Sequence, residues 1–146
     1  MPWRGSHDDD RNPPRHQLEL DVLPETYTIC RMPHGAAAPW ASGTLSSVSR
    51  SAREAEGTTV ISDEATVPET VEADRGWHAL RIGGVFGFGE VGVLGAVLNP
   101  LARAGVPVMV VCTFETDYVL VKASRFERVR QVLLDAGHRF VDPPAA

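Results

Sequence analysis

The residue types with the clearest chemistry lie in a glycine-rich loop, residues 83–89, and in a polar turn, residues 113–117. The loop, GGVFGFG, precedes a helical pattern that begins near Glu90, so it presents the unbonded N–H groups of a helix start. Such a start favours an anion, for example the α-carboxylate of a free amino acid, and glycine lets the ligand approach the backbone closely. In the turn, Thr113 supplies a hydroxyl and Asp117 a carboxylate that suits an ammonium or guanidinium group. Loop and turn together predict a binding site for a small molecule.

The same loop contains a G-x-G-x-x-G motif, from Gly87 to Gly92, with Glu115 and Asp117 a little over twenty residues further on. This arrangement is that of a dinucleotide-binding fingerprint. Two features argue against that interpretation. The acidic residues are followed by a hairpin strand, where a dinucleotide fold requires another crossover to a parallel strand, and Glu90 would repel a pyrophosphate. A nucleotide-binding enzyme domain is therefore the least favoured function.

A strand, a helix and a two-stranded hairpin must position the loop and the turn. Residues 77–82 form a short strand, and the helix after the loop ends at the cap Gly105, with Pro100 predicting a kink or break near Asn99. Its apolar stripe consists of Val93, Leu94, Val97, Leu98 and Leu101. The apolar run 106–112 suits a buried strand, and the five-residue link to a strand at 118–121 is too short for a crossover helix. These two strands should therefore pair antiparallel.

A second helix follows, with an apolar stripe over residues 126–136, and residues 138–141 form a last strand. The order β-α-β-β-α-β predicts a ferredoxin-like α+β fold, in which a four-stranded antiparallel sheet carries two helices on one face. Before it, residues 17–23 and 26–32 are strand-like, and residues 44–50 and 58–62 resemble a hairpin. This first half is interpreted as an abbreviated copy of the second. We therefore expect a disordered tail at 1–16, an abbreviated unit at 17–70 and a complete unit at 71–142.

Several segments of the chain resemble the ACT domain, a βαββαβ module that binds amino acids and regulates metabolic enzymes. The resembling residues are Gly92-Val93-Leu94, Pro100-Leu101-Ala102, Ala104-Gly105 and, above all, the segment TFETDYVLV at 113–121. The likeness extends over about residues 18–142 and is closest to small bacterial ACT proteins related to the CASTOR-type cytosolic arginine sensors. Proteins of this branch carry two ACT-like units, so the resemblance implies two tandem units here, the first of them abbreviated.

In the arginine-sensing relatives, ligand contacts come from the start of this helix and from this hairpin turn. The resemblance therefore assigns ligand binding to Glu90, Gly92 and Val93 at the helix start and to Thr113, Phe114 and Asp117 on the turn. The carboxylates of Glu90 and Asp117 point to an amino acid with a basic side chain. A purely structural interpretation stays open, because Asp117 also stabilises a turn and Glu90 also complements a helix dipole. The relatives enclose their ligand between two ACT domains, so a second wall would come from residues 17–70 or from a second copy of the chain.

Composition and charge narrow the range of partners. The net charge of −5 gives no electrostatic case for nucleic acid or for an anionic membrane, and no apolar stretch is long enough to cross a bilayer. Cys30 and Cys112 lie in apolar runs and are predicted to be buried free thiols, which fits a cytoplasmic protein. The five histidines lack metal-ligand spacing and no nucleophile motif is present. We therefore expect neither an enzyme nor a bound metal or other cofactor.

The function predicted from the sequence is that of an amino-acid-binding regulatory sensor, with its ligand at an interface between ACT units. The alternative is a ligand-free ACT-type dimerisation module that acts by docking on a partner. Two copies should form a homodimer, because the first unit has too little helix to cover its sheet and the small residues Gly92, Gly95 and Ala96 permit close approach. The expected interface lies beside residues 83–93.

Overall fold

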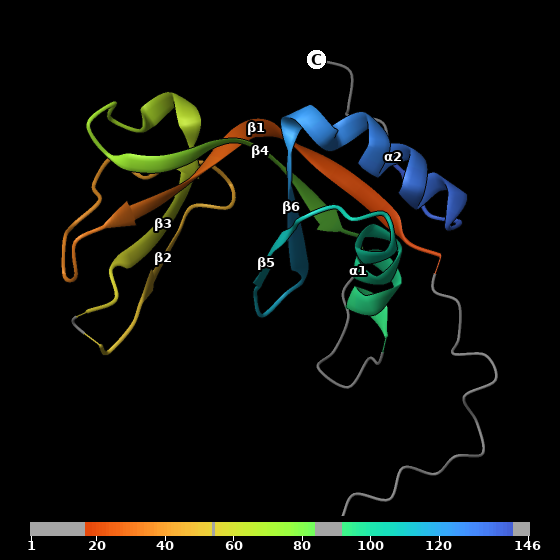
Figure 1. Ribbon diagram of the computed structural model, residues 1–146, viewed down its shortest axis with the longest axis horizontal. Helices are drawn as coiled ribbons and strands as arrows, with labels where there is room; N and C mark the ends of the chain where they lie inside the picture. The colour runs from red at the N-terminus through yellow and green to blue at the C-terminus, as the bar shows by residue number, and fades with distance from the viewer. Residues whose placement is uncertain (1–16, 54, 84–91, 142–146) are drawn as a thin grey trace, which may run out of the picture.

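The computed structural model describes residues 17–53, 55–83 and 92–141 and shows an α+β fold built on one curled sheet (Figure 1). The first half contributes β1 (Glu19–Met32), β2 (Ser47–Arg50), β3 (Thr58–Asp63), the 3₁₀ turn η1 (Glu64–Thr66) and β4 (Glu72–Ile82). The second half contributes α1 (Val93–Arg103), β5 (Met109–Cys112), β6 (Asp117–Lys122), the 3₁₀ turn η2 (Ala123–Arg125), α2 (Phe126–Asp135) and β7 (Arg139–Phe140). The predicted β-α-β-β-α-β order from β4 to β7 is confirmed. No helix in these described ranges has the length and apolarity needed to cross a membrane.

The strand order β2-β3-β1-β4-β6-β5 contains the ferredoxin arrangement twice. Strands β1 to β4 stand in the order expected of a βαββαβ unit, although no α-helix lies between them within the described residues. Strands β4, β6 and β5 repeat the arrangement, with β4 now acting as the first strand. One strand therefore serves both ACT-like units, and the boundary between residues 70 and 71 stays a prediction.

The start of β1 occupies a position that a simple four-stranded unit does not contain. Leu20 and Val22 pair with Ile82 and Leu80 at the end of β4, and β7 pairs in parallel with β1, through Leu20 and Phe140. The last strand of the second unit thus lies beside β1, with β1 between it and β4. The apolar residues of this β1 segment belong to the same core as the helices, which explains why the segment inserts there.

β1 runs without interruption through Pro24 and Glu25, so the strand-like segments 17–23 and 26–32 belong to one strand. Its pairing with β4 shifts register between Val22 and Thr26. Such an irregularity accommodates Pro24, which has no N–H to give to a ladder, while the chain stays extended on both sides. The predicted hairpins are confirmed, since β2 pairs antiparallel with β3 and β5 pairs antiparallel with β6.

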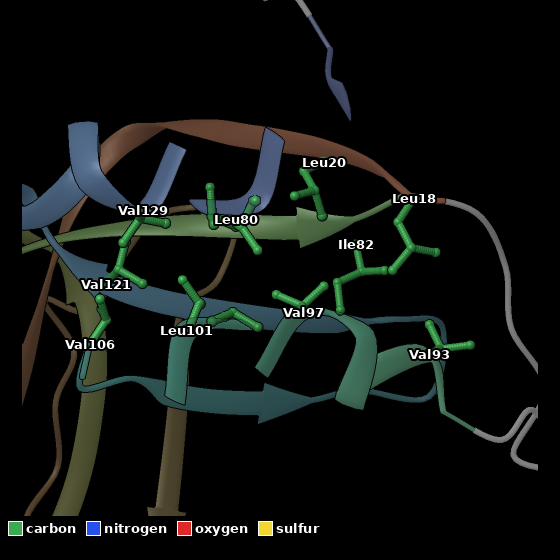
Figure 2. Close-up of a cluster of buried hydrophobic side chains, with 12 residues drawn as sticks. Leu18, Leu20, Leu80, Ile82, Val93, Val97, Leu101, Val106, Val121 and Val129 are labelled. Atoms are coloured by element: carbon green, nitrogen blue, oxygen red, sulfur yellow. The ribbon is translucent and has the colours of Figure 1, made fainter. Parts of the chain in front are cut away.

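The two helices cover one face of the sheet and enclose the larger core (Figures 1 and 2). Three residues of the predicted α1 stripe, Val93, Val97 and Leu101, are 5%, 0% and 0% exposed. Figure 2 shows them on the helix side of the sheet, next to Leu80 and Ile82 of β4. Burying one side chain of this kind stabilises the fold by about 1.5–3 kcal/mol. The core therefore fixes the start of α1 against the end of β4.

The opposite face of the sheet is concave, because the two halves curl toward each other (Figure 1). Tyr27 is fully buried on this face, and its hydroxyl accepts a hydrogen bond from the Leu45 N–H at 3.0 Å. Trp77 and Leu120 belong to the same buried cluster, so strands of both halves contribute to it. A second core thus joins the halves on the face that carries no helix.

Helix α1 continues through Pro100, so of the kink or break predicted near Asn99 the break is absent. A proline cannot donate to the carbonyl one turn earlier, which belongs to Ala96. The buried ring of His138 supplies the missing donor: Nε2 lies 2.8 Å from the Ala96 oxygen, while Nδ1 accepts the Leu18 N–H at 3.1 Å. Both contacts together require a neutral ring with its hydrogen on Nε2. The break was predicted because the compensating residue lies 42 positions further along the chain, where no local pattern reveals it.

Candidate functional site

The β5–β6 turn is held by its own hydrogen bonds. Thr113 donates its backbone N–H to the Thr116 oxygen at 2.9 Å and its hydroxyl to the same oxygen at 2.7 Å. The Thr113 hydroxyl also accepts the Thr116 N–H at 3.2 Å. Its only proton is therefore committed to the turn, and one lone pair remains for a ligand. In this state Thr113 can act as an acceptor and not as a donor.

Thr116 anchors the turn to the end of β4. Its side-chain hydroxyl donates to the Ile82 carbonyl at 2.7 Å, and the residue is 6% exposed. The residue that follows β4, Gly83, donates its N–H to the Glu19 oxygen at 2.7 Å. The sequence analysis did not select Thr116, because its partner is a backbone carbonyl 34 positions away and no local pattern signals it. Through this hydrogen bond, Thr116 positions the turn that carries Thr113, Phe114 and Asp117.

Asp117 lies on the helix side of the sheet. Side chains alternate along a strand, so Asp117 shares a face with Val119 and Val121, both of which belong to the core beneath α1 and α2. It is half-buried and stands directly opposite Cys112 across the hairpin. Partial burial raises the pKa of the Cys112 thiol, and the Asp117 carboxylate raises it further through a hydrogen bond and its negative charge. The carboxylate is therefore close enough to influence a neighbouring group on this face.

The two cysteines differ from the prediction in one respect. Cys30 is buried and free, as expected, and burial raises the pKa of its thiol. Cys112 is free but exposed, because β5 is an edge strand and the residue stands next to the turn. The prediction that both thiols are buried was wrong for Cys112, since an apolar run does not reveal which of its residues ends at a sheet edge.

Gly92 and Val93 form the start of α1. Gly92 has a φ of +82°, a left-handed conformation that favours glycine, and its carbonyl accepts the Ala96 N–H at 2.9 Å. Val93 is 5% exposed and packs in the same core as Ile82, so its side chain is not available to a ligand. What the helix start can offer is backbone N–H groups and the positive end of the helix dipole.

The structure brings the helix start and the turn to the same end of the sheet. Val93 packs near Ile82, as Figure 2 shows, and Thr116 binds the carbonyl of that same Ile82. Phe114 lies on the turn and is 80% exposed. Of the six predicted ligand residues, Glu90 lies outside the described residues and the other five occupy this end. Backbone donors and a carboxylate on one face are the groups that complement a zwitterionic amino acid.

In the described ranges, no group of three His, Cys, Asp or Glu side chains is arranged to hold a metal ion. The buried histidine, His138, has both ring nitrogens engaged by backbone groups of β1 and α1. The binding interpretation of the turn therefore depends on Asp117, Thr113 and the helix start alone.

Comparison with known proteins gives the family. A family model described as "ACT domain" matches residues 72–135. Protein Atu0741 from Agobacterium tumefaciens is 30% identical, with 86% of this chain and 93% of that chain covered and a TM-score of 0.79. No curated protein matches the sequence.

Two aspartate kinase structures share the fold at low identity. The regulatory subunit of aspartate kinase from Thermus flavus is 12% identical, with 83% of this chain and 97% of that chain covered and a TM-score of 0.55. Aspartate kinase from Synechocystis is also 12% identical, with 88% of this chain but 28% of that chain covered and a TM-score of 0.64. The predicted relation to the arginine sensors stays a prediction. With an ACT domain over residues 72–135 and close similarity to the Agobacterium protein along its length, the chain is an ACT-domain protein of the same family as that relative.

Proposed function

We propose that this protein is a cytoplasmic regulatory sensor, not an enzyme, that binds a free amino acid at the end of the sheet where α1 begins. The observation that carries the proposal is the position of Asp117, a half-buried carboxylate on the helix side of the sheet, at the end where Gly92 and Val93 start α1. The helix start would take the α-carboxylate, and Asp117 would take an ammonium group. The resemblance of the fold to the regulatory subunit of an aspartate kinase supports a regulatory role.

The donor and acceptor inventory of the turn favours a ligand rich in N–H groups. Asp117 is an acceptor, and the Thr113 hydroxyl has already given its proton to the Thr116 oxygen. Glu115, next along the turn, is exposed and adds a second negative charge. A ligand whose side chain is an ammonium or guanidinium would satisfy these acceptors, whereas a second carboxylate would be repelled. We therefore propose an amino acid with a basic side chain.

The second wall of the site would come from another copy of the chain. The turn carries Phe114 at 80% exposure, and α1 has a partly exposed Gly95 and an exposed Asn99. A two-fold homodimer beside residues 83–93 would enclose the ligand and couple its binding to dimer stability. Sedimentation at micromolar protein, with and without each amino acid, measures this; a clean monomer in every condition would contradict it.

A thermal-shift screen of the twenty amino acids and NAD(P) identifies the ligand class. Calorimetry then compares the wild type with Asp117→Asn and with the matched control Glu115→Gln, which removes an exposed carboxylate two residues away. Loss of a charged hydrogen-bond partner should weaken binding by about tenfold or more in Asp117→Asn, with little change in the control. Equal affinities for the wild type and Asp117→Asn would move the site elsewhere.

The alternative function is that of a ligand-free module that docks on a partner through this same end of the sheet. The observation that favours it is the exposure of Phe114 on the turn, because a large exposed aromatic residue is typical of a contact surface. A homodimer that forms without any amino acid and responds to none of them would support this alternative over the sensor. A thermal shift with NAD(P) alone would support the nucleotide interpretation instead.

A further inference from the structure

The first half of the chain repeats the strand topology around the candidate site, but its cavity lies on the opposite, concave face of the sheet. In the second half, the site lies where the end of β4 meets the β5–β6 turn. In the first half, the end of β1 meets the β2–β3 turn in the same relation, because β3 pairs with β1 as β6 pairs with β4. The closing pairs correspond as well: Arg50 stands opposite Thr58 as Cys112 stands opposite Asp117. The difference is that no α-helix lies between β1 and β2, whose connection the structure describes in full.

A surface cavity of about 400 Å³, open to solvent, lies beside the β2–β3 turn and is large enough for a small organic ligand. Residues of β1, Ile29 to Arg31, form one side, and Glu56, Gly57 and Thr59 form the other. Arg31 and Thr59 are a directly opposed pair, so both point to the concave face of the sheet. The cavity is therefore built from two neighbouring strands and the turn that follows β2.

Gly57 allows the Arg31 side chain to lie along this cavity. A Cβ at position 57 would stand 2.6 Å from the Met32 oxygen, 3.3 Å from Arg31 Cγ and 3.4 Å from Arg31 Nε. Only glycine lets the turn and the arginine stem come so close. Glu72 stands opposite Arg31 on β4, yet the two form no ion pair among the described residues. The guanidinium is thus turned toward the turn and keeps its donors for another acceptor.

The charges lining the cavity are of opposite sign. Arg31 presents a fork of N–H donors that matches a carboxylate in two parallel hydrogen bonds. Glu56 presents a carboxylate that suits an ammonium group, and no ion pair joins it to Arg31 within the described ranges. The Ile29 side chain adds apolar surface and Thr59 a hydroxyl. A positive and a negative group beside a small apolar surface complement an α-amino acid zwitterion.

We propose that the first half holds a second site for a free amino acid, in which Arg31 binds the α-carboxylate and Glu56 the ammonium group. Both side chains are exposed to solvent, and Arg31 points to the concave face, opposite to the face on which α1 begins. This inference rests on the proposed amino-acid-binding function, but it assigns a separate place with separate residues. It also makes the abbreviated half a binding element rather than a remnant.

The experiment is a titration of the full chain with each of the twenty amino acids, followed by amide NMR and calorimetry. Amides of Gly57 and Thr59 report on the new site, and those of Thr116 and Asp117 report on the site at α1. Arg31→Met keeps an unbranched aliphatic side chain beside Gly57 and removes the positive charge. Arg50→Met is the matched control, because Arg50 opposes Thr58 and so points to the other face of the sheet.

The expected result is that an amino acid shifts the Gly57 and Thr59 amides, and that Arg31→Met weakens this response about tenfold or more while Arg50→Met leaves it unchanged. Asp117→Asn should leave the Gly57 response in place. If amino acids shift only the Thr116 and Asp117 amides, the second site is overturned and the proposed function stands. If no amino acid shifts either set, both are overturned. A Gly57 response equal in the wild type and Arg31→Met also overturns the assignment.

Discussion

The pairing of Pro100 with His138 gives the most sharply testable consequence of the structure. Replacing His138 by Phe keeps a ring of similar size and removes both nitrogens. The Leu18 N–H and the Ala96 carbonyl then lose the partners that lie at 3.1 Å and 2.8 Å. A buried polar group left without a partner costs about 1–3 kcal/mol. Two such groups, one of them only partly buried, should lower the free energy of unfolding by about 3 kcal/mol.

The second half of this prediction uses Pro100→Ala. The alanine of this variant would carry an N–H that can donate to the Ala96 carbonyl, as in an uninterrupted helix. In that background, His138→Phe should leave only the Leu18 N–H unsatisfied. Its cost should therefore fall by about 1–2 kcal/mol relative to the same change in the wild type, and the difference is the coupling energy of the pair.

Urea unfolding at neutral pH measures all four proteins of this cycle. Domains of this size are stable by about 5–15 kcal/mol, so each variant should remain folded enough for a complete transition. Two outcomes would refute the reasoning. One is a cost below about 1 kcal/mol for His138→Phe, and the other is an equal cost in both backgrounds, which would mean that His138 does not compensate for Pro100.

Three further predictions concern single contacts. Asp117→Asn removes the charge that helps to raise the pKa of Cys112, so alkylation of Cys112 by iodoacetamide at pH 8 should become faster, and an unchanged or slower rate would contradict this. Lys122→Met breaks the ion pair between Lys122 and Asp74, in which the Lys122 hydrogen bond lowers the pKa of the Asp74 carboxyl. The two side chains are 32% and 58% exposed, so the free energy of unfolding in urea should fall by less than about 1 kcal/mol. Gly95→Ala, inside α1, should stabilise by up to about 1 kcal/mol in the same assay, since the added Cβ meets only Asn99 Nδ2 at 3.4 Å, and a loss of stability would count against that packing.

Local patterns were sufficient to predict most elements. The apolar stripe of Val93, Val97 and Leu101 identified α1, and the five-residue link after the run 106–112 identified the antiparallel β5–β6 hairpin. Both features depend on residues near each other in sequence, where periodicity and loop length decide the structure. The fold class follows from the order of such elements.

Features that depend on distant partners were missed. The insertion of β1 between β4 and β7 depends on pairings such as Glu19 with Arg139, and the unbroken α1 depends on His138. No local pattern contains either partner. The same holds for Thr116, whose hydroxyl binds the Ile82 carbonyl and so sets the position of the candidate site.

The location of the candidate site could be predicted from the sequence, but the hydrogen bonds of its side chains could not. Five of the six predicted residues lie at one end of the sheet, because the helix start and the hairpin turn both follow from local rules. Which groups of the turn are free to bind a ligand could be decided only from the hydrogen bonds in the structure. The Thr113 hydroxyl was expected to be free to bind a ligand, yet its proton is held by the Thr116 oxygen. Val93 stays a predicted ligand residue, and since its side chain is 5% exposed and lies in the core, only its backbone could contact a ligand.

The parallel pairing of β7 with the start of β1 has a consequence for synthesis on the ribosome. Leu18 and His138 are hydrogen-bonded across 120 positions of the chain, and Glu19 pairs with Arg139. The edge of β1 at this point must wait for β7, which is synthesised about 120 positions later, before it is covered. Until then the nascent chain exposes an apolar strand edge, the kind of surface that chaperones bind and that promotes misassembly. Contacts of such long range also slow folding, so closure of this edge should be the last step in forming the sheet.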